Sequence, residues 1–139
     1  MPLVGGGGAG NVAGSNPAGI GSSLNYVGDF VFAYSGPINA NSSTSADTTL
    51  LNFTTGSEII MGTIAFQTNE VANNVIYFDV IMNGSSILQG AWDNSGSGQA
   101  TANTPIDMVI PSYSHIQVNW GITGGAGADA TCQILGRIY

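Results

Sequence analysis

Two candidates for nucleophilic or acid–base catalysis, His115 and Cys132, are each the only residue of their type in this 139-residue sequence, and no two of its eight carboxylates fall at a recognisable acid–base spacing. A catalytic histidine needs a partner that orients it, and the only acidic residue within ten positions of His115 is Asp107. A nucleophilic cysteine needs a nearby base or helix terminus that lowers its pKa, and the sequence around Cys132 indicates neither. We therefore interpret His115 as a solvent-facing or interface residue and Cys132 as a small buried one, and we expect no enzyme activity.

Several glycine-rich stretches resemble metal or phosphate sites but lack the required context. GGAGADATC (124–132) partly matches a calcium-binding nonapeptide, yet that motif works in tandem copies, and Thr131 stands at its apolar position. DNSGSG (93–98) is better explained as a polar loop. The G-x-G-x-x-A pattern occurs in GGGGAGNVA (5–13) and GAGADA (125–130), but dinucleotide binding requires a strand before the pattern and a helix after it. The first copy has no strand before it, and the second runs into a predicted strand. One cysteine and one histidine cannot form a structural zinc site, so we predict no metal and no cofactor.

Charge limits the classes of partner. Only 6% of the residues are charged, the formal net charge is −7, and Arg137 is the only strong base. Contacts to nucleic acid phosphates and to anionic lipid both require clustered lysine and arginine, so we expect neither nucleic acid nor membrane binding. A surface of Ser, Thr, Asn, Gln and Gly meets its partners through shape, backbone hydrogen bonds and apolar area instead.

The elements that must position any site are strands. Short runs of β-branched and aromatic residues alternate with turn clusters, which is typical of an all-β sandwich or barrel. Eight strands with long connections favour an antiparallel β-sandwich of the single jelly-roll type, preceded by a Gly/Ser/Asn-rich N-terminal arm over residues 1–24, with the domain at 25–139. The predicted strands are Asp29–Ile38, Thr48–Thr54, Glu58–Gln67, Val75–Met82, Ser85–Trp92, Thr104–Ile110, His115–Ile122 and Ala130–Tyr139.

Alternation within the strands predicts which side chains face the core. In HIQVNWGI the apolar face carries Trp120, and in VIYFDVIM it carries Phe78. The same period in DFVFAY predicts that Phe30, Phe32 and Tyr34 face inward. Between strands, Asn83-Gly84 predicts a tight type I′ hairpin, and Pro111 predicts the end of a strand.

A second set of residues is expected at the surface and forms the candidate assembly contacts. Tyr77, Ile59 and Leu135 are expected to face outward beside exposed tyrosine and tryptophan residues, and exposed aromatic residues are common at subunit interfaces. In the glycine-rich arm, isolated apolar residues could seat in shallow pockets of a partner. The candidate contacts are Val4, Val12, Pro17, Ile20, Trp92, Tyr113 and Tyr139.

The stretch MVIPSYSHIQVNWGITGG (108–125), followed by ATCQILGRIY (130–139), resembles the last strands of small jelly-roll virion proteins. With the glycine-rich arm, the chain resembles the capsid decoration (cement) proteins of tailed bacteriophages and single jelly-roll minor capsid proteins. The resemblance implies a homotrimer that binds the major capsid protein on the outer surface of the virion, reinforces the shell and is assembled in the host cytoplasm. The absence of a signal-peptide pattern after Met1 agrees with that expectation.

Two other functions compete with this one. A receptor- or carbohydrate-binding head domain of a tail fibre or spike would use Trp92, Tyr113 and the long loops. An enzyme such as a jelly-roll glycosidase or a metal-dependent cupin is disfavoured, because a cupin needs several histidine and carboxylate ligands and this chain has one histidine.

Overall fold

The computed structural model describes residues 24–40, 44–68, 74–94, 105–124 and 128–139, with side chains in the last part of β8 described only as far as Ala91. The described residues form strands and turns, with no helix among them. Within them there is consequently no helix long and apolar enough to cross a membrane. The strands are β2 (Asn25–Val27), β3 (Phe30–Tyr34), β4 (Ile38–Asn39), β5 (Thr48–Thr54), β6 (Ile60–Thr68), β7 (Asn74–Met82), β8 (Ser85–Asn94), β9 (Ile106–Ile110), β10 (His115–Ile122) and β11 (Asp129–Ile138).

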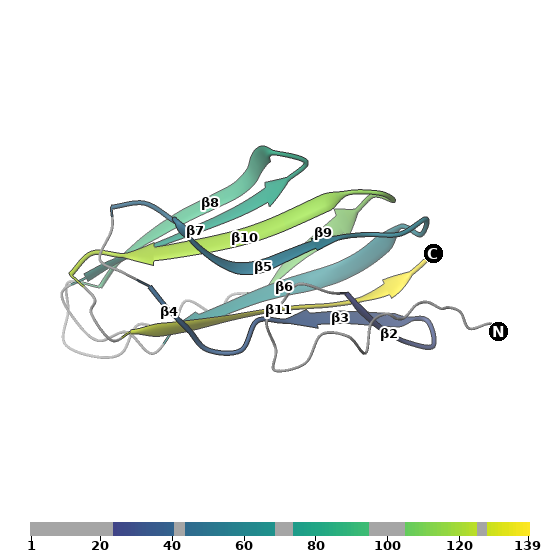
Figure 1. Ribbon diagram of the computed structural model, residues 1–139, viewed down its shortest axis with the longest axis horizontal. Coiled ribbons are helices and arrows are strands. Elements are labelled where there is room, and N and C mark those ends of the chain that lie inside the picture. The colour runs from purple at the N-terminus through teal and green to yellow at the C-terminus, as the bar shows by residue number, and fades with distance from the viewer. Residues whose placement is uncertain (1–23, 41–43, 69–73, 95–104, 125–127) are drawn as a thin grey trace.

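Two antiparallel sheets face each other (Figure 1). One has four strands in the order β5-β10-β7-β8, and the other has six, in the order β2-β3-β11-β6-β9 with β4 paired to β11. Among the eight longer strands, every connection except the β7–β8 hairpin passes from one sheet to the other. This is the connectivity of a jelly roll, so the predicted all-β sandwich is confirmed, with ten strands in the described residues rather than eight.

The strand predictions hold with small shifts. The predicted strand Asp29–Ile38 is interrupted after Tyr34, where Gly36 has a φ of 69°, and resumes as β4. Asn83 and Gly84 have φ values of 51° and 83°, which confirms a turn with two positive φ values, as a type I′ hairpin requires. Strand β9 ends one residue before Pro111, as predicted.

Side chains from both sheets fill the space between them. Phe66 of β6 packs against Phe78 of β7 with ring centroids 4.8 Å apart, and against Trp120 of β10 at 6.4 Å. Leu24, the last residue of the predicted arm, also belongs to this core. The inward positions of Phe78, Trp120 and Cys132 are therefore as predicted.

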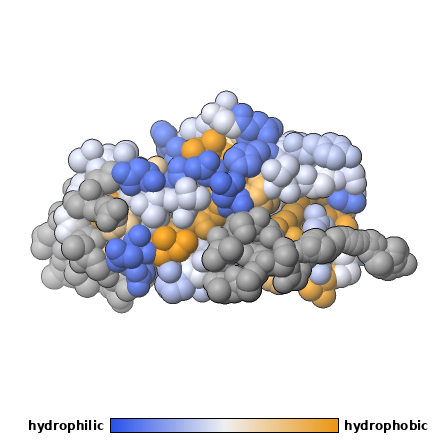
Figure 2. Space-filling view, in the orientation of Figure 1, coloured by the Kyte–Doolittle hydropathy of each residue, from blue (hydrophilic) through white to orange (hydrophobic). Residues whose placement is uncertain are grey.

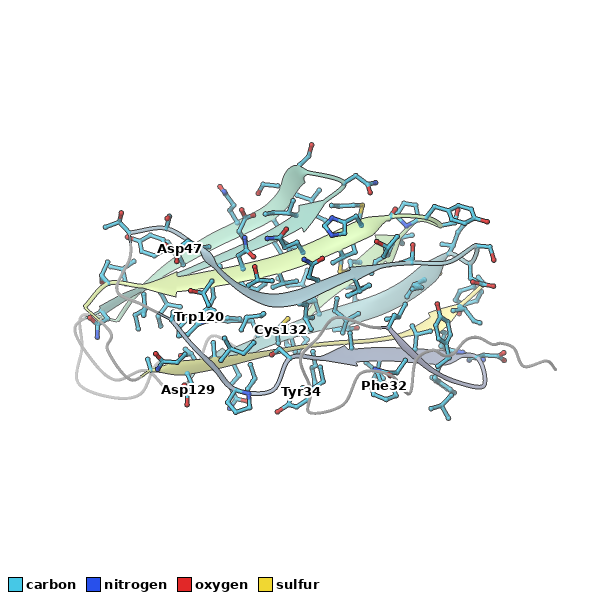
Figure 3. The ribbon with its side chains drawn as sticks, in the orientation of Figure 1. Phe32, Tyr34, Asp47, Trp120, Asp129 and Cys132 are labelled. Atoms are coloured by element: carbon cyan, nitrogen blue, oxygen red, sulfur yellow. The ribbon has the colours of Figure 1, made fainter. Side chains whose placement is uncertain are left out.

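The prediction for β3 is wrong. Val31 and Ala33 are fully buried, whereas Phe30, Phe32 and Tyr34 are 50%, 40% and 45% exposed. Figure 3 shows Phe32 and Tyr34 projecting below the lower sheet, while Trp120 and Cys132 lie between the sheets. The physical reason is that both alternating sets of β3 are apolar, so alternation alone does not decide which set faces inward. The sandwich buries the set with the smaller side chains, Val31 and Ala33.

Candidate docking surface

The outward side chains of the six-stranded sheet lie in rows that cross its strands, because directly paired residues of antiparallel strands share a face. One row crosses five strands. Its members are Val27 (β2), Phe30 (β3), Arg137 (β11), Met61 (β6) and Val109 (β9). With about 4.8 Å between strands, the row is roughly 19 Å long.

Two more rows extend this surface along the strands. In the next row, Phe32 is paired with Leu135 of β11, which is 58% exposed. In the third row, Tyr34 is paired with Gln133. We call the exposed large apolar residues of these rows the apolar face. They are Val27, Phe30, Phe32, Tyr34, Met61, Val109 and Leu135.

The apolar face holds seven of the eleven large apolar side chains that are exposed in the described part of the chain. A fully buried aromatic residue covers roughly 150–250 Å², so seven half-exposed side chains present on the order of several hundred Å². Patches of that size mark interaction sites, and a standard interface takes about 800 Å² from each partner. In Figure 2 hydrophilic residues gather over the upper, four-stranded sheet, and a hydrophobic patch emerges at the lower right beneath β2 and β3.

The only strong base of the chain lies within the apolar face. The guanidinium carbon of Arg137 stands 5.0 Å from the ring centroid of Phe30, and its Nη2 is 3.9 Å from a carboxylate oxygen of Asp29. Because both side chains of this ion pair are more than half exposed, the pair adds little to stability. It does bring a positive and a negative charge together, so the middle of the row is nearly neutral.

The outward face of the four-stranded sheet has a different character. Asn119 Oδ1 accepts hydrogen bonds from Thr49 Oγ1 and Gln117 Nε2, both at 3.0 Å. His115 Nε2 lies 2.6 Å from Asn52 Oδ1. Polar side chains of this face thus bind one another across β5 and β10.

The structure separates the predicted contact residues. Tyr113 and Tyr139 are 73% and 70% exposed, as predicted, and both lie at the end of the sandwich where β10 begins. Strand β8 pairs Trp92 with Ile76, whose partner in β10 is Ile122 at the opposite end of that strand. Since β10 has eight residues, Trp92 and Tyr113 stand roughly 25 Å apart along it. They cannot form one sugar site together, and the side chain of Trp92 is outside the described part.

Sequence reasoning missed the apolar face because it placed its central aromatic residues in the core. It did predict the outward positions of Leu135 and Ile59. A further sequence signal for the apolar face was the alternation of β11. Leu135 directly follows the inward Ile134, so a large apolar residue occupies an outward position where a polar one is usual. The candidate contacts Val4, Val12, Pro17 and Ile20 lie outside the described residues.

His115 and Cys132, the two residues considered for catalysis, lie in different sheets. Burial raises the pKa of the Cys132 thiol well above its ordinary value, which keeps the sulfur in its weakly nucleophilic protonated form. His115 lies on the outward side of β10, whereas Cys132 lies on the inward side of β11 in the other sheet. Within the described ranges no three His, Cys, Asp or Glu residues are grouped so as to hold a metal ion.

No protein-family model and no curated protein matches the sequence. The VP2 subviral particle of infectious bursal disease virus has a TM-score of 0.42 at 13% identity, over 81% of this chain and 34% of that chain. The Gt strain of the same virus has a TM-score of 0.43 at 13% identity, over 81% and 34%. Its T13 viral particle has a TM-score of 0.42 at 11% identity, over 99% and 36%. This chain spans about a third of those proteins, and at these TM-scores the likeness assigns it neither a family nor a role.

Proposed function

We propose that this chain is a virion structural protein, a capsid decoration or minor capsid subunit that binds the outer shell and stabilises it through contacts between subunits. The observation that carries the proposal is the apolar face. A rigid sheet that exposes Phe30, Phe32 and Leu135 side by side is suited to bury them against another protein, because burial of apolar area drives association.

The chemistry of the apolar face favours a protein shell over other partners. Its one cation, Arg137, is already paired with Asp29 and stacked on Phe30, so the surface offers no cluster of free positive charge to phosphates. A net charge of −7 on the whole chain also repels nucleic acid and anionic lipid. The partner in the proposal is the major capsid protein, contacted through an apolar patch of low charge.

The proposal places the protein as a homotrimer on the outer surface of the particle and gives it no catalytic role. Three copies on one symmetry axis would each present the same face, so every copy would make the same contact with the shell. The mass of the purified protein in solution, measured by light scattering, tests the trimer independently of shell binding.

The test of shell binding is co-sedimentation of the full chain with particles stripped of it. Leu135→Asp places a charge in the apolar face, and we expect it to weaken binding at least about thirtyfold, because an unpaired charge would be buried at the contact. Thr54→Asp adds the same charge on the outward side of β5, in the other sheet, where Thr54 is exposed, and should bind like the wild type. Equal binding by both variants, or equal loss in both, would contradict docking through the apolar face.

A further inference from the structure

A groove of about 430 Å³ lies on the outward side of the four-stranded sheet, on the opposite side of the sandwich from the apolar face. Strands β7 and β8 form its floor and residues 44–46 form one wall. Its volume lies within the range of small-ligand sites, about 300–1,000 Å³. The side chains that give it chemical character are Thr44, Ser45, Tyr77, Asp79 and Gln89.

The wall of the groove passes closely over a glycine of the neighbouring strand. Gly121 of β10 is paired with Tyr77 of β7 and shares its outward side. A Cβ added at Gly121 would collide with the carbonyl oxygen of Ser45, so residues 44–46 pass directly over this position. The absence of a side chain at Gly121 therefore sets how closely the wall approaches the floor.

The floor combines a ring, a carboxylate, an amide and small residues. Tyr77 and Asp79 are half-buried, and Asp79 stands directly opposite Gln89 in the β7–β8 pair. Ser86 Oγ donates a hydrogen bond to Asp79 Oδ1, which orients the carboxylate. Beside Gln89, Gly90 and Ala91 leave room above the floor. A carboxylate accepts hydrogen bonds, and an amide both donates and accepts them.

We propose that this groove binds a neutral saccharide. An aromatic ring gives a flat apolar surface for the C–H face of a pyranose, and the Asp79–Gln89 pair can accept from and donate to neighbouring hydroxyl groups. Thr44 and Ser45 line the wall beside this floor. An anionic ligand is disfavoured by Asp79 and by the net charge of −7, and a purely apolar ligand would desolvate the carboxylate without adding a hydrogen bond to it.

The saccharide site and the docking site are independent of each other, because they lie on opposite outer faces of the sandwich. A protein fixed to a shell by its six-stranded sheet would present this groove away from the shell. The site differs from the one expected from the sequence, since it uses Tyr77 rather than Tyr113 or Trp92.

The experiment is a titration of the isotope-labelled full chain with a panel of methyl glycosides of glucose, galactose, mannose and N-acetylglucosamine, followed by backbone-amide chemical shifts. We expect at least one glycoside to shift the amides of residues 77–79 and 89–91, with a dissociation constant on the order of millimolar for a single sugar ring. Tyr77→Ala and Asp79→Asn should each weaken binding about tenfold. Tyr77→Phe keeps the ring and should bind within about twofold of the wild type.

Matched controls lie elsewhere on the molecule. Tyr113→Ala removes an exposed tyrosine at the end of the sandwich, and Asp107→Asn neutralises an exposed carboxylate of the six-stranded sheet; both should leave the affinity unchanged. Leu135→Asp should also bind the glycoside normally even where it no longer binds particles, which separates the two proposals. The inference is overturned if no glycoside shifts these amides, if the shifts centre on Tyr113, or if Tyr77→Ala and Asp79→Asn bind as tightly as the wild type.

Discussion

The two outer faces of this sandwich follow the same two-residue alternation but carry opposite chemistry. On the six-stranded sheet, the outward positions of β3 and β11 include Phe30, Phe32 and Leu135. On the four-stranded sheet, the outward positions of β10 are His115, Gln117 and Asn119, which bind polar partners on β10 itself or on the neighbouring β5. The difference teaches that the jelly roll fixes where outward residues point, whereas their types decide which face is suited to contact a protein.

The polar side chains of the β5–β10 face form hydrogen bonds with one another, whereas the apolar face leaves apolar area exposed to water. Each hydrogen bond within the β5–β10 network replaces one to water, so the network has little to gain from a protein partner. Apolar area has no such internal partner, and burying several hundred Å² of it would contribute on the order of 10 kcal/mol at about 25 cal/mol per Å². Much of that gain is offset by the lost freedom of the two partners, so the contact needs most of the apolar face to be buried.

The largest effect on the free energy of unfolding should come from placing a carboxylate on the inward side of β3 rather than on its outward side. Ala33→Asp places a carboxylate at a fully buried position opposite Ile134, and we expect it to lower the free energy of unfolding by at least about 3 kcal/mol. Phe32→Asp puts the same group on the outward side and should cost about 1–2 kcal/mol, because Phe32 is already 40% exposed. Urea denaturation of both variants measures the difference. If Phe32→Asp were the more damaging change, the orientation of β3 would be reversed.

This orientation is what the sequence could not supply. In FVFAY both alternating sets are apolar, so periodicity locates the strand but does not say which set faces inward. The inward set of β10 was easier to predict, because polar residues separate Ile116, Val118 and Trp120. The jelly-roll class and most strand positions therefore followed from local pattern and turn chemistry. The apolar face did not, since it depends on which of the two apolar sets of β3 is buried between the sheets.

The next effect is a pH dependence of stability that arises from Cys132, on the inward side of β11. Burial raises the pKa of Cys132 in the folded state, while the unfolded thiol ionises near its ordinary value of about 8.5. Below that pH both states hold the proton and stability is unaffected. Above it only the unfolded chain loses the proton, so the free energy of unfolding should fall by about 1.4 kcal/mol per pH unit.

Chemical denaturation under reducing conditions at a series of alkaline pH values measures this slope. Burial, with a smaller contribution from the charge of Glu58, also raises the pKa of Tyr26, so Tyr26 contributes to the slope at alkaline pH. Cys132→Ala is therefore the reference, and the two slopes should differ by one proton. Identical slopes would mean that the thiol ionises in the folded protein, and the inward side of β11 would then be open to water.

A smaller effect is expected on the polar face. Asn119→Ala removes the acceptor shared by Thr49 and Gln117, and we expect a loss of about 1 kcal/mol because water can reach both donors and partly replace it. Thr54→Ala, at an exposed position of the same face, should change stability by no more than about 0.5 kcal/mol. Thermal denaturation of the two variants makes the comparison. Equal stability of both would show that the network is no stronger than the hydrogen bonds to water that it replaces.

Only part of the candidate saccharide groove could be predicted from the sequence. Tyr77 was recognised as outward-facing, but the pairing of Asp79 with Gln89 depends on the register of β7 and β8, which the Asn83-Gly84 turn alone indicates only near the hairpin. The wall formed by residues 44–46 depends on contact with Gly121, which is distant in sequence. No local pattern predicts such a contact.

The smallest effect is expected at the centre of the apolar face. Arg137→Gln removes the cation above the ring of Phe30 and the ion pair with Asp29, and each is worth at most about 1 kcal/mol at an exposed site. We expect the free energy of unfolding to fall by less than about 1 kcal/mol, and Arg137→Lys, which keeps the charge, to lie between this variant and the wild type. Because salt screens the ion pair, part of the difference from the wild type should disappear at high ionic strength. A loss above about 2 kcal/mol would mean that Arg137 supports the fold itself, and the face would then be a structural surface rather than one free for docking.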